Sequence, residues 1–417
     1  MTFLEKIDEV VLLNQDKITD WFRKKEGEVK IPFYTSVDLR VSENKITAVD
    51  TNIFPGGFNN LSATFIDQAA KLTRDFKSES HSNKIKKVLI VPEFHTRNNF
   101  YWDNILSLVK ILEKANLKVR VGLYEGDFGE YEFTASDNEK VLASKIKRVG
   151  DKVFLDDFEP DLVLINNDLS DSSPAILENL DQLVVPPTEV GWHSRKKNIH
   201  FEFYNKLVTE FSEMLNLDPF NFSLATRLVE DINFDILEDR ERLADLTNEM
   251  IRELVGHYEV KNPLIFIKNN TGTYGMAVMQ VQKGEELLSL NRDGRKKMKV
   301  SKGGSFLKNI ILQEGVETIY RNKEPVYYLI NSSLAGGFYR VNDSKGSMHN
   351  LNTKGMYFKC LCPGAGVKNC KNDDCNLYIH PSLEVISRIG SLATGYEIDY
   401  LLKKNHRSDD SSLSALL

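Results

Sequence analysis

The most informative segment of the chain is Ile265-Phe-Ile-Lys-Asn-Asn-Thr-Gly-Thr-Tyr-Gly-Met-Ala-Val-Met-Gln-Val281. It predicts an apolar strand that ends in Lys268, a short loop with two glycines, and a second apolar strand. Gly272 and Gly275 allow a tight turn whose N–H groups approach phosphate oxygens, and Lys268 adds a cation to the same anion. No Gly-Lys-Ser/Thr closes the loop, so it is not a Walker loop. The alternatives are a nucleotide-phosphate loop and a plain hairpin whose lysine is solvated.

The composition is that of an ordinary globular enzyme. The chain has 417 residues, enough for two or three domains, with 41% hydrophobic and 27% charged residues. A net charge of −6 gives no electrostatic footprint for nucleic acid. No run approaches the roughly 18 apolar residues of a membrane helix, and the acidic, amphipathic amino terminus does not resemble a signal peptide. We expect a cytoplasmic protein that binds neither nucleic acid nor membranes, and a homo-oligomer stays open.

Hydrophobic periodicity predicts an α/β fold. Residues 1–215 predict an open, doubly wound α/β layer domain, because continuous apolar runs alternate with helix patterns, as in a parallel sheet covered on both faces. The strands expected there are residues 35–41, 45–50, 88–92, 119–124, 161–166 and 182–186, and the helices are residues 1–27, 61–76 and 101–115. A helical region at 195–257 leads into an α+β nucleotide-binding domain over 216–404, and a flexible tail is expected at 405–417. The later strands and last helix expected are residues 310–313, 325–331, 337–342 and 383–402.

The expected parallel sheet also locates a ligand site. Ligands of open α/β sheets bind beyond the carboxyl ends of the strands. Those ends carry polar side chains, among them Glu93, Asn166, Asp168 and Glu189.

Three elements follow the glycine hairpin in an order that suits phosphoryl transfer. Gln313-Glu-Gly-Val316 ends an apolar strand and offers backbone groups to an adenine edge, and Arg340 closes a hairpin near the phosphates. The candidate Mg²⁺ ligands are the side-chain oxygens of Asn350, Asn352, Glu314 and Glu324. The alternative is that Arg340 makes a surface ion pair and the asparagines are turn residues.

A polar loop in the first half has the groups that an amino acid requires. The loop lies in Ser36-Val-Asp-Leu-Arg40 and Val49-Asp-Thr-Asn-Ile-Phe-Pro-Gly-Gly-Phe-Asn-Asn60. Its two aspartates would pair an ammonium and its arginine would clamp a carboxylate bidentately. The candidate substrate ligands are Asp38, Arg40, Asp50, Asn52, Asn59 and Asn60. Two phenylalanines indicate a loop packed into a defined shape, and the alternative is an Asn/Gly-rich connection.

All four cysteines fall in one short segment, as Cys360, Cys362, Cys370 and Cys375. A disulfide scaffold does not suit a long chain without an export signal. The two alternatives are a structural Zn²⁺ held by four thiolates and free thiols in a surface loop.

Together these segments resemble the proteobacterial glutamate–cysteine ligase family of the GshA type. The resemblance is carried by the amino-half motif, by the 268–276 loop and, in the same order, by Gly191-Trp-His-Ser-Arg-Lys196, residues 313–316 and Gly336-Gly-Phe-Tyr-Arg340. It spans nearly the whole chain and implies an ATP-grasp-like domain and ATP-dependent joining of L-glutamate to L-cysteine, the first committed step of glutathione synthesis. The nucleotide ligands it implies are Lys268, Thr271, Gly272, Thr273, Tyr274, Gly275, Met276, Gln313, Glu314 and Val316. Arg195 joins the substrate ligands on the same ground.

The reaction class implies a mechanism with an acyl phosphate. ATP, with Mg²⁺, would phosphorylate the γ-carboxylate of glutamate, and the cysteine amine would then displace phosphate. Lys268 and Arg340 are the expected catalytic residues. Two other functions stay open: another ATP-grasp amino-acid or peptide ligase, such as a glutathione synthetase-like enzyme, and a non-catalytic protein that binds a nucleotide or zinc.

Overall fold

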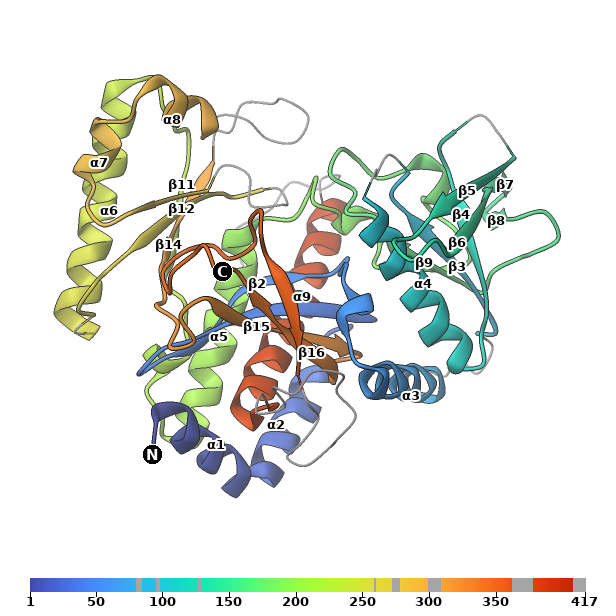
Figure 1. The fold of residues 1–417 in the computed structure, drawn as a ribbon, viewed down its shortest axis with the longest axis horizontal. Helices are drawn as coiled ribbons and strands as arrows, with labels where there is room; N and C mark the ends of the chain where they lie inside the picture. Colours follow the sequence, from blue (N-terminus) through green and yellow to red (C-terminus); the bar gives the residue numbers. More distant parts are fainter. Residues whose placement is uncertain are drawn as a thin grey trace.

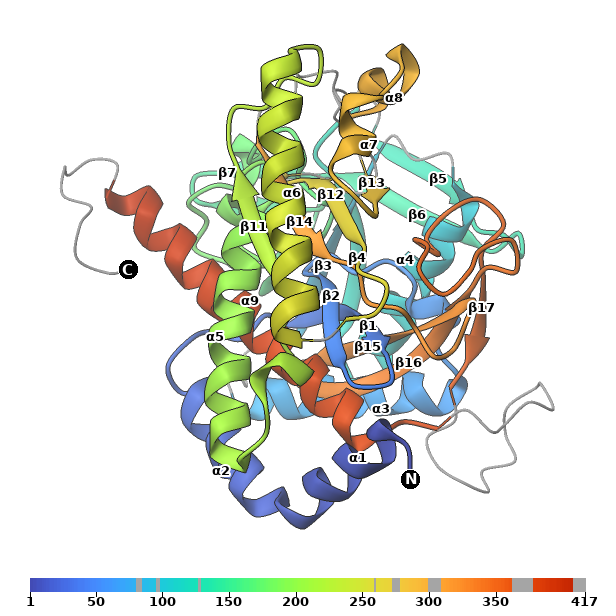
Figure 2. The same ribbon diagram turned by 90° about the vertical axis from the view of Figure 1, so that its left-hand side faces the viewer.

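The computed structural model describes residues 1–79, 85–94, 98–126, 129–258, 260–271, 278–298, 309–361 and 378–407 of the chain. Three main sheets organise these residues, and Figures 1 and 2 show them around a common centre. The α/β class expected from the sequence is confirmed.

A five-stranded antiparallel sheet forms the base of the molecule. Its order is β17 (Tyr357–Cys360), β16 (Ser333–Val341), β15 (Lys323–Ile330), β1 (Tyr34–Val41) and β2 (Ile46–Asn52). Apolar and polar residues alternate along β1, so that Val37, Leu39 and Val41 are fully buried. The long helix α9 (Pro381–Arg407) packs on β1, β2 and β15. The elements that complete this part are α1 (Phe3–Leu13), α2 (Gln15–Glu26), α3 (Ala63–Glu79) and α5 (Lys197–Leu215).

A six-stranded sheet with the order β10-β9-β3-β4-β6-β5 forms the second part. Its strands are β3 (Lys87–Pro92), β4 (Lys118–Leu123), β5 (Glu130–Thr134), β6 (Lys140–Lys145), β9 (Leu162–Asn166) and β10 (Leu183–Val185). All neighbours are parallel except β5 and β6. Helix α4 (Asn99–Lys114) makes the crossover from β3 to β4, and the small pair β7 (Lys147–Val149) and β8 (Lys152–Phe154) lies beside the sheet. The expected parallel sheet is therefore present.

The third part is a four-stranded antiparallel sheet with the order β11-β14-β12-β13. Its strands are β11 (Thr226–Val229), β12 (Ile265–Asn269), β13 (Val278–Val281) and β14 (Ile310–Glu314). Helices α6 (Leu237–Tyr258), α7 (Glu285–Leu288) and α8 (Arg292–Lys297) belong to the same part (Figure 1). Short 3₁₀ turns occur at Phe58–Asn60, Ala175–Leu177, Thr188–Val190 and Pro219–Asn221.

Three details differ from the sequence expectation. Residues 1–27 form two helices, because Asn14 ends α1 and precedes α2. The region 195–257 is not wholly helical, since β11 separates α5 from α6 and pairs with β14. The strands β1 and β2, expected within 1–215, form one sheet with β15, which lies within 216–404. The domain boundaries at 215 and 404 stay predictions. None of the described helices is both long and apolar enough to cross a membrane.

Candidate active site

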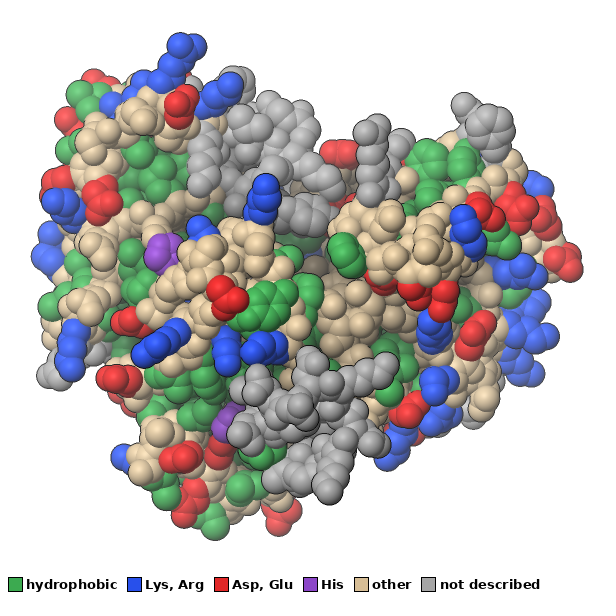
Figure 3. Space-filling view, in the orientation of Figure 1, with side chains coloured by type: hydrophobic (Ala, Val, Ile, Leu, Met, Phe, Trp, Pro, Cys, Tyr) green, Lys and Arg blue, Asp and Glu red, His purple; other side chains and the backbone are tan. Residues whose placement is uncertain are grey.

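One large cavity lies where the three sheets meet, with a volume of about 1430 Å³. The five-stranded sheet contributes its polar face, the four-stranded sheet contributes β12 and β14, and the parallel sheet contributes the carboxyl ends of its strands. The space-filling view shows the surface hollowed between the second and third parts (Figure 3). The cavity lining includes Asp38, Arg40, Asp50, Asn52, Asn59, Asn60, Glu93, Asn166, Asp168, Lys268, Thr271, Gln313, Glu314, Val316, Glu324, Arg340, Asn350 and Asn352.

The polar face of the five-stranded sheet follows from strand register. Asp38 lies opposite Asp50 across β1 and β2, and Glu324 lies opposite Arg340 across β15 and β16. Because side chains two apart on a strand share a face, Ser36, Asp38 and Arg40 point away from the residues that α9 covers. Two carboxylates directly opposite each other repel. Each aspartate is accordingly paired with a cation.

Arg340 is fixed by two carboxylates. Its Nη1 donates to Asp38 Oδ2 and to Glu324 Oε1, each at 2.6 Å. Burial alone would lower the pKa of the Arg340 guanidinium, but these two carboxylates outweigh burial and raise it. Arg340 therefore presents a permanent, oriented positive charge at the cavity.

Arg40 makes different contacts from those expected. Its Nη1 donates to the carbonyl of Ser347 at 2.9 Å, its Nη2 donates to the carbonyl of His349 at 2.7 Å, and Nη2 also lies 2.9 Å from Glu324 Oε2. Its guanidinium is thus occupied by the loop that carries Asn350. The structure gives Arg40 a positioning contact, and a bidentate clamp on a substrate carboxylate would require it to leave these oxygens.

Lys268 lies at the end of β12 and its Nζ donates to Gln313 Oε1 on β14 at 2.5 Å. Burial lowers the pKa of the Lys268 ammonium to about 8, and the positive charge of Lys197 contributes to the decrease. Asp50 shows the opposite effect. Burial alone would raise the pKa of the Asp50 carboxyl, but Lys197, Lys268 and Arg195 lower it to about 2. Asp50 is therefore ionised at neutral pH.

The loop that follows β2 is held by side chains from α4 and β9. Asn104 on α4 accepts hydrogen bonds from the N–H groups of Gly57 and Phe58, at 2.8 and 3.0 Å, and donates to Asn166 Oδ1. Asn166 at the end of β9 donates to the carbonyl of Pro55 at 3.0 Å. Gly57 has φ +127°, and a Cβ there would lie 2.7 Å from the Tyr328 hydroxyl, so only glycine fits.

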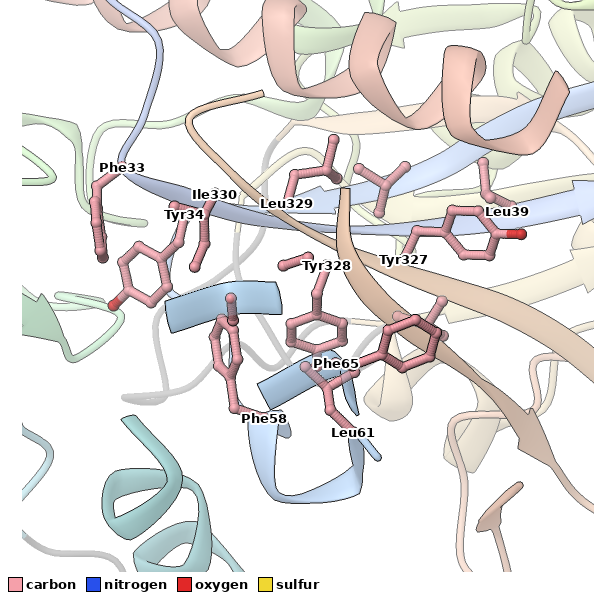
Figure 4. Packing of buried hydrophobic residues seen from close by; sticks show 14 of the residues in the cluster. Phe33, Tyr34, Leu39, Phe58, Leu61, Phe65, Tyr327, Tyr328, Leu329 and Ile330 are labelled. Atoms are coloured by element: carbon pink, nitrogen blue, oxygen red, sulfur yellow. The ribbon is translucent and has the colours of Figure 1, made fainter. Parts of the chain in front are cut away.

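Aromatic packing completes the loop. Phe58 is fully buried and lies between Tyr34 and Tyr328 (Figure 4). Phe54 is 6% exposed. The prediction that this loop is packed into a defined shape is confirmed. Asn59 and Asn60, at its end, line the cavity.

Several expected site residues lie elsewhere or are already bonded. Arg195 does not line the large cavity; its guanidinium donates to both oxygens of Glu397, at 2.9 and 2.7 Å, and is 2% exposed. The carboxylate of Glu314 binds Lys45 Nζ at 2.7 and 2.8 Å. The N–H groups of Glu314 and Gly315 donate to the carbonyls of Ala225 and Leu264, while Val316 lines the cavity.

The structure brings only some of the expected metal ligands to the cavity. Asn350 and Asn352 line the cavity, but Asn350 Oδ1 accepts the N–H of Asn352 at 2.9 Å. Within the described ranges, no group of three His, Cys, Asp or Glu side chains is arranged to hold a metal ion. Gly272 to Met276 lie outside the described residues, as do Cys362, Cys370 and Cys375, while Cys360 ends β17.

Two residues of the cavity, Lys197 and Asn104, were not predicted from the sequence. Lys197 lines the cavity. It directly follows the segment Gly191–Lys196, which carries part of the family resemblance, but its side chain was not among the predicted ligands. Asn104 gave no sequence signal, because it is one polar residue on the buried face of a helix. Glu93, Asn166 and Asp168 lie at the carboxyl edge expected for ligands.

Comparison with known proteins finds one family over most of the chain. A family model described as GshA, glutamate-cysteine ligase, matches residues 8–398. A crystal structure of a provisionally assigned γ-glutamylcysteine synthetase from Methylobacillus flagellatus KT is 31% identical, with 95% of this chain and 96% of that chain covered and a TM-score of 0.82. No curated protein matches significantly.

Two ligases resemble the chain only distantly. D-alanyl-alanine synthetase A from Vibrio cholerae O1 biovar eltor str. N16961 is 10% identical over 66% of this chain and 74% of that chain, with a TM-score of 0.34. D-cycloserine synthetase DcsG is 9% identical over 75% of this chain and 82% of that chain, with a TM-score of 0.39. Neither likeness is close enough to bear on the site.

Proposed function

The chain belongs to the glutamate–cysteine ligase family, and from this membership we propose that its central cavity is the place where ATP, L-glutamate and L-cysteine react. The family implies small-molecule substrates, ATP and a divalent metal ion. The observation that supports this location is the convergence of Lys268, Arg340 and three carboxylates, Asp38, Asp50 and Glu324, in one cavity. Cations suit the phosphates of ATP, and carboxylates suit an ammonium or a metal ion.

The chemistry follows from the poor reactivity of a carboxylate. A γ-carboxylate oxygen of glutamate attacks the γ-phosphorus of ATP, the bond to the β-phosphate oxygen breaks, and ADP leaves. The cysteine amine then attacks the acyl carbon and loses a proton, the carbon–oxygen bond to phosphate breaks, and inorganic phosphate leaves. The product is γ-glutamylcysteine.

Lys268 and Arg340 supply the fixed charge for the first step. Lys268 would bind the phosphates from β12, and Arg340 would stabilise the charge that develops on the transferring group. Asp38 and Glu324 hold the guanidinium in place before substrate arrives, at 2.6 Å each. A charge fixed in advance needs no reorganisation during the reaction.

We propose Mg²⁺ as the metal ion. Mg²⁺ at a nucleotide takes one or two protein carboxylates together with phosphate oxygens, and it would neutralise phosphate charge there. Asp38 and Asp50 fit this need, since they lie opposite each other at the cavity and the Asp50 side chain is 48% exposed. Asn350 and Asn352 remain candidates for further oxygen ligands.

The test is ATP-dependent release of phosphate from the purified chain with two substrate pairs. We expect turnover with glutamate plus cysteine, and none with γ-glutamylcysteine plus glycine. Turnover of the second pair alone would assign the chain to a glutathione synthetase-like reaction. Binding of ATP without turnover of either pair would favour the non-catalytic alternative.

A further inference from the structure

The floor of the cavity has an apolar half beside its charged residues. Val326 on β15, Phe338 on β16 and Phe358 on β17 all line the cavity. Val326 lies opposite Phe338, and Phe358 lies opposite Arg340. Cross-strand partners share a face of the sheet, as do residues two apart on one strand, so these three side chains lie on the same face as Arg340. Together the three apolar side chains form an apolar strip next to the guanidinium.

Aromatic packing holds the apolar strip in place. The Phe338 ring lies edge-on to Phe358, with ring centres 4.9 Å apart, and its centre is 5.4 Å from that of Tyr328. The Tyr328 hydroxyl donates to the carbonyl of Gly56 at 2.9 Å, so the loop after β2 satisfies the polar end of this ring. Val326 and Phe338 are 1% and 2% exposed, whereas Phe358 on the edge strand is 37% exposed. The strip is therefore a preformed wall whose open end is Phe358.

The proposed function so far gives this wall no ligand. Phosphates and a metal ion require charged groups, which Lys268, Arg340 and the three carboxylates supply. The adenine edge is expected at residues 313–316, which belong to the end of β14 and the turn after it. Glutamate carries charges at both ends. Cysteine differs, because its side chain is short and its sulfur is a weak hydrogen-bonding group that contacts aromatic rings favourably.

The position of the strip relative to Arg340 favours cysteine as its ligand. In the proposed reaction the cysteine amine attacks the acyl carbon, whose phosphoryl group Arg340 stabilises. The amine must therefore reach a point close to this guanidinium. Since the cysteine side chain is short, its sulfur lies near its own amine, and so near Arg340. Phe358 is the cross-strand partner of Arg340, and Phe338 precedes it by two residues on the same strand.

We propose that the apolar strip of Val326, Phe338 and Phe358 binds the side chain of the amine-donating amino acid and selects a small, polarisable group such as a thiol. This inference rests on the proposed function and names residues that determine its second amino-acid substrate. A hydroxyl in place of the thiol would lose its hydration without gaining a hydrogen bond from these hydrocarbon side chains, so serine should be disfavoured. A methyl group in that place needs no hydrogen bond and should be accepted.

The test compares Phe358→Ala with Phe358→Leu and with Lys359→Ala, a control at the next residue of the strand, which alternation places on the other face. Phosphate release is measured with ATP, glutamate and one of three amine donors: L-cysteine, L-2-aminobutyrate or L-serine. We expect Phe358→Ala to raise the KM for cysteine about tenfold, while the KM values for glutamate and ATP change less than about twofold. Phe358→Leu keeps an apolar wall and should stay within about threefold of the wild type. The control should match the wild type.

The choice of amine donor is the second readout. The wild type should use 2-aminobutyrate about 100-fold better than serine in kcat/KM. Phe358→Ala admits water to the wall, so this ratio should fall to about tenfold. Equal use of the two donors by the wild type, or a cysteine KM in Phe358→Ala within about twofold of the wild type, overturns the inference. A rise in the KM for ATP or glutamate alone also overturns it, because the strip would then contact adenine or the glutamate methylenes.

A binding experiment separates the inference from the proposed function. If the wild type shows no turnover with glutamate and cysteine, the proposed function fails. Titration calorimetry of L-cysteine and L-serine into the protein with magnesium and ADP then decides the inference. Tighter binding of cysteine than of serine, lost in Phe358→Ala, supports it, and equal binding of both overturns it. Should Phe358→Ala not fold, judged by circular dichroism, Phe338→Leu keeps the core filled and gives the same comparison.

Discussion

Replacing Lys268 by methionine should stabilise the protein at neutral pH while removing its activity. Burial holds the pKa of this ammonium at about 8, against an ordinary value of 10.5. That difference corresponds to about 3 kcal/mol of destabilisation at neutral pH, and allowing for partial exposure reduces it to about 2 kcal/mol. Loss of the hydrogen bond to Gln313 lowers the free energy of unfolding by about 1 kcal/mol. We expect a net gain of about 1 kcal/mol at pH 7, together with loss of turnover by orders of magnitude.

The pH dependence of this gain is the sharper part of the prediction. Between pH 8 and 10.5 the unfolded chain keeps the Lys268 proton that the folded chain has lost, so the wild type gains stability as pH rises through this window. The penalty is fully present below pH 8 and absent above pH 10.5. Between pH 8 and pH 10.5, the free energy of unfolding of the wild type should therefore rise by about 2 kcal/mol relative to that of the variant.

The assay is thermal unfolding of both proteins at pH 7 and pH 10.5, followed by circular dichroism. Groups that do not interact with Lys268 titrate alike in both proteins. Their effects cancel in the difference between the two midpoints, which should change by about 2–4 °C. Lys206→Met is the matched control and should show no such change. A midpoint difference for Lys268→Met that is the same at both pH values would refute the account of Lys268 as a buried cation held at a cost.

Three further results are expected. Affinity for ADP, measured by calorimetry, should fall about tenfold per pH unit above pH 8, because Lys268 loses its charge there. A constant affinity up to pH 9.5 would show that Lys268 does not bind phosphate. Asn104→Ala removes the acceptor for two loop N–H groups, so the free energy of unfolding should fall by about 2–4 kcal/mol. The KM for glutamate should rise. An unchanged glutamate KM would show that this loop does not bind glutamate. Arg40→Lys cannot hold two carbonyls and Glu324 together, and we expect a higher KM for glutamate with little change for ATP. A shift in the ATP dependence alone would place Arg40 on the nucleotide side.

Much of the fold could be predicted from local sequence, because hydrophobic period reports which face of an element is buried. The apolar runs of β3, β4 and β9 predicted the parallel sheet. The alternation in β1 predicted a strand with one apolar and one polar face. The pairing of β1 with β15 could not be seen, since it joins residues about three hundred positions apart and periodicity carries no information about partners. Short strands such as β11 and β17 were missed for a related reason, as their four residues are too few to show a period.

The candidate site was predictable where residue chemistry is unusual for its context. Ligand binding is predicted by two aspartates and an arginine beside glycines, and by a lysine at the end of an apolar strand. These residues line one cavity. What each side chain binds could not be predicted, because it depends on neighbours from other elements. Arg195 meets Glu397 and Glu314 meets Lys45, and both pairs are buried contacts between distant segments. Such pairs are set by tertiary packing alone.

We expect this cavity to activate the γ-carboxylate of glutamate by phosphorylation. The most direct test uses glutamate labelled with ¹⁸O in its γ-carboxylate, with ATP and cysteine, and analyses the released inorganic phosphate by mass spectrometry. We expect one labelled oxygen in each phosphate, because the carboxylate oxygen that attacks ATP leaves with the phosphoryl group. Unlabelled phosphate, formed together with γ-glutamylcysteine, would contradict it.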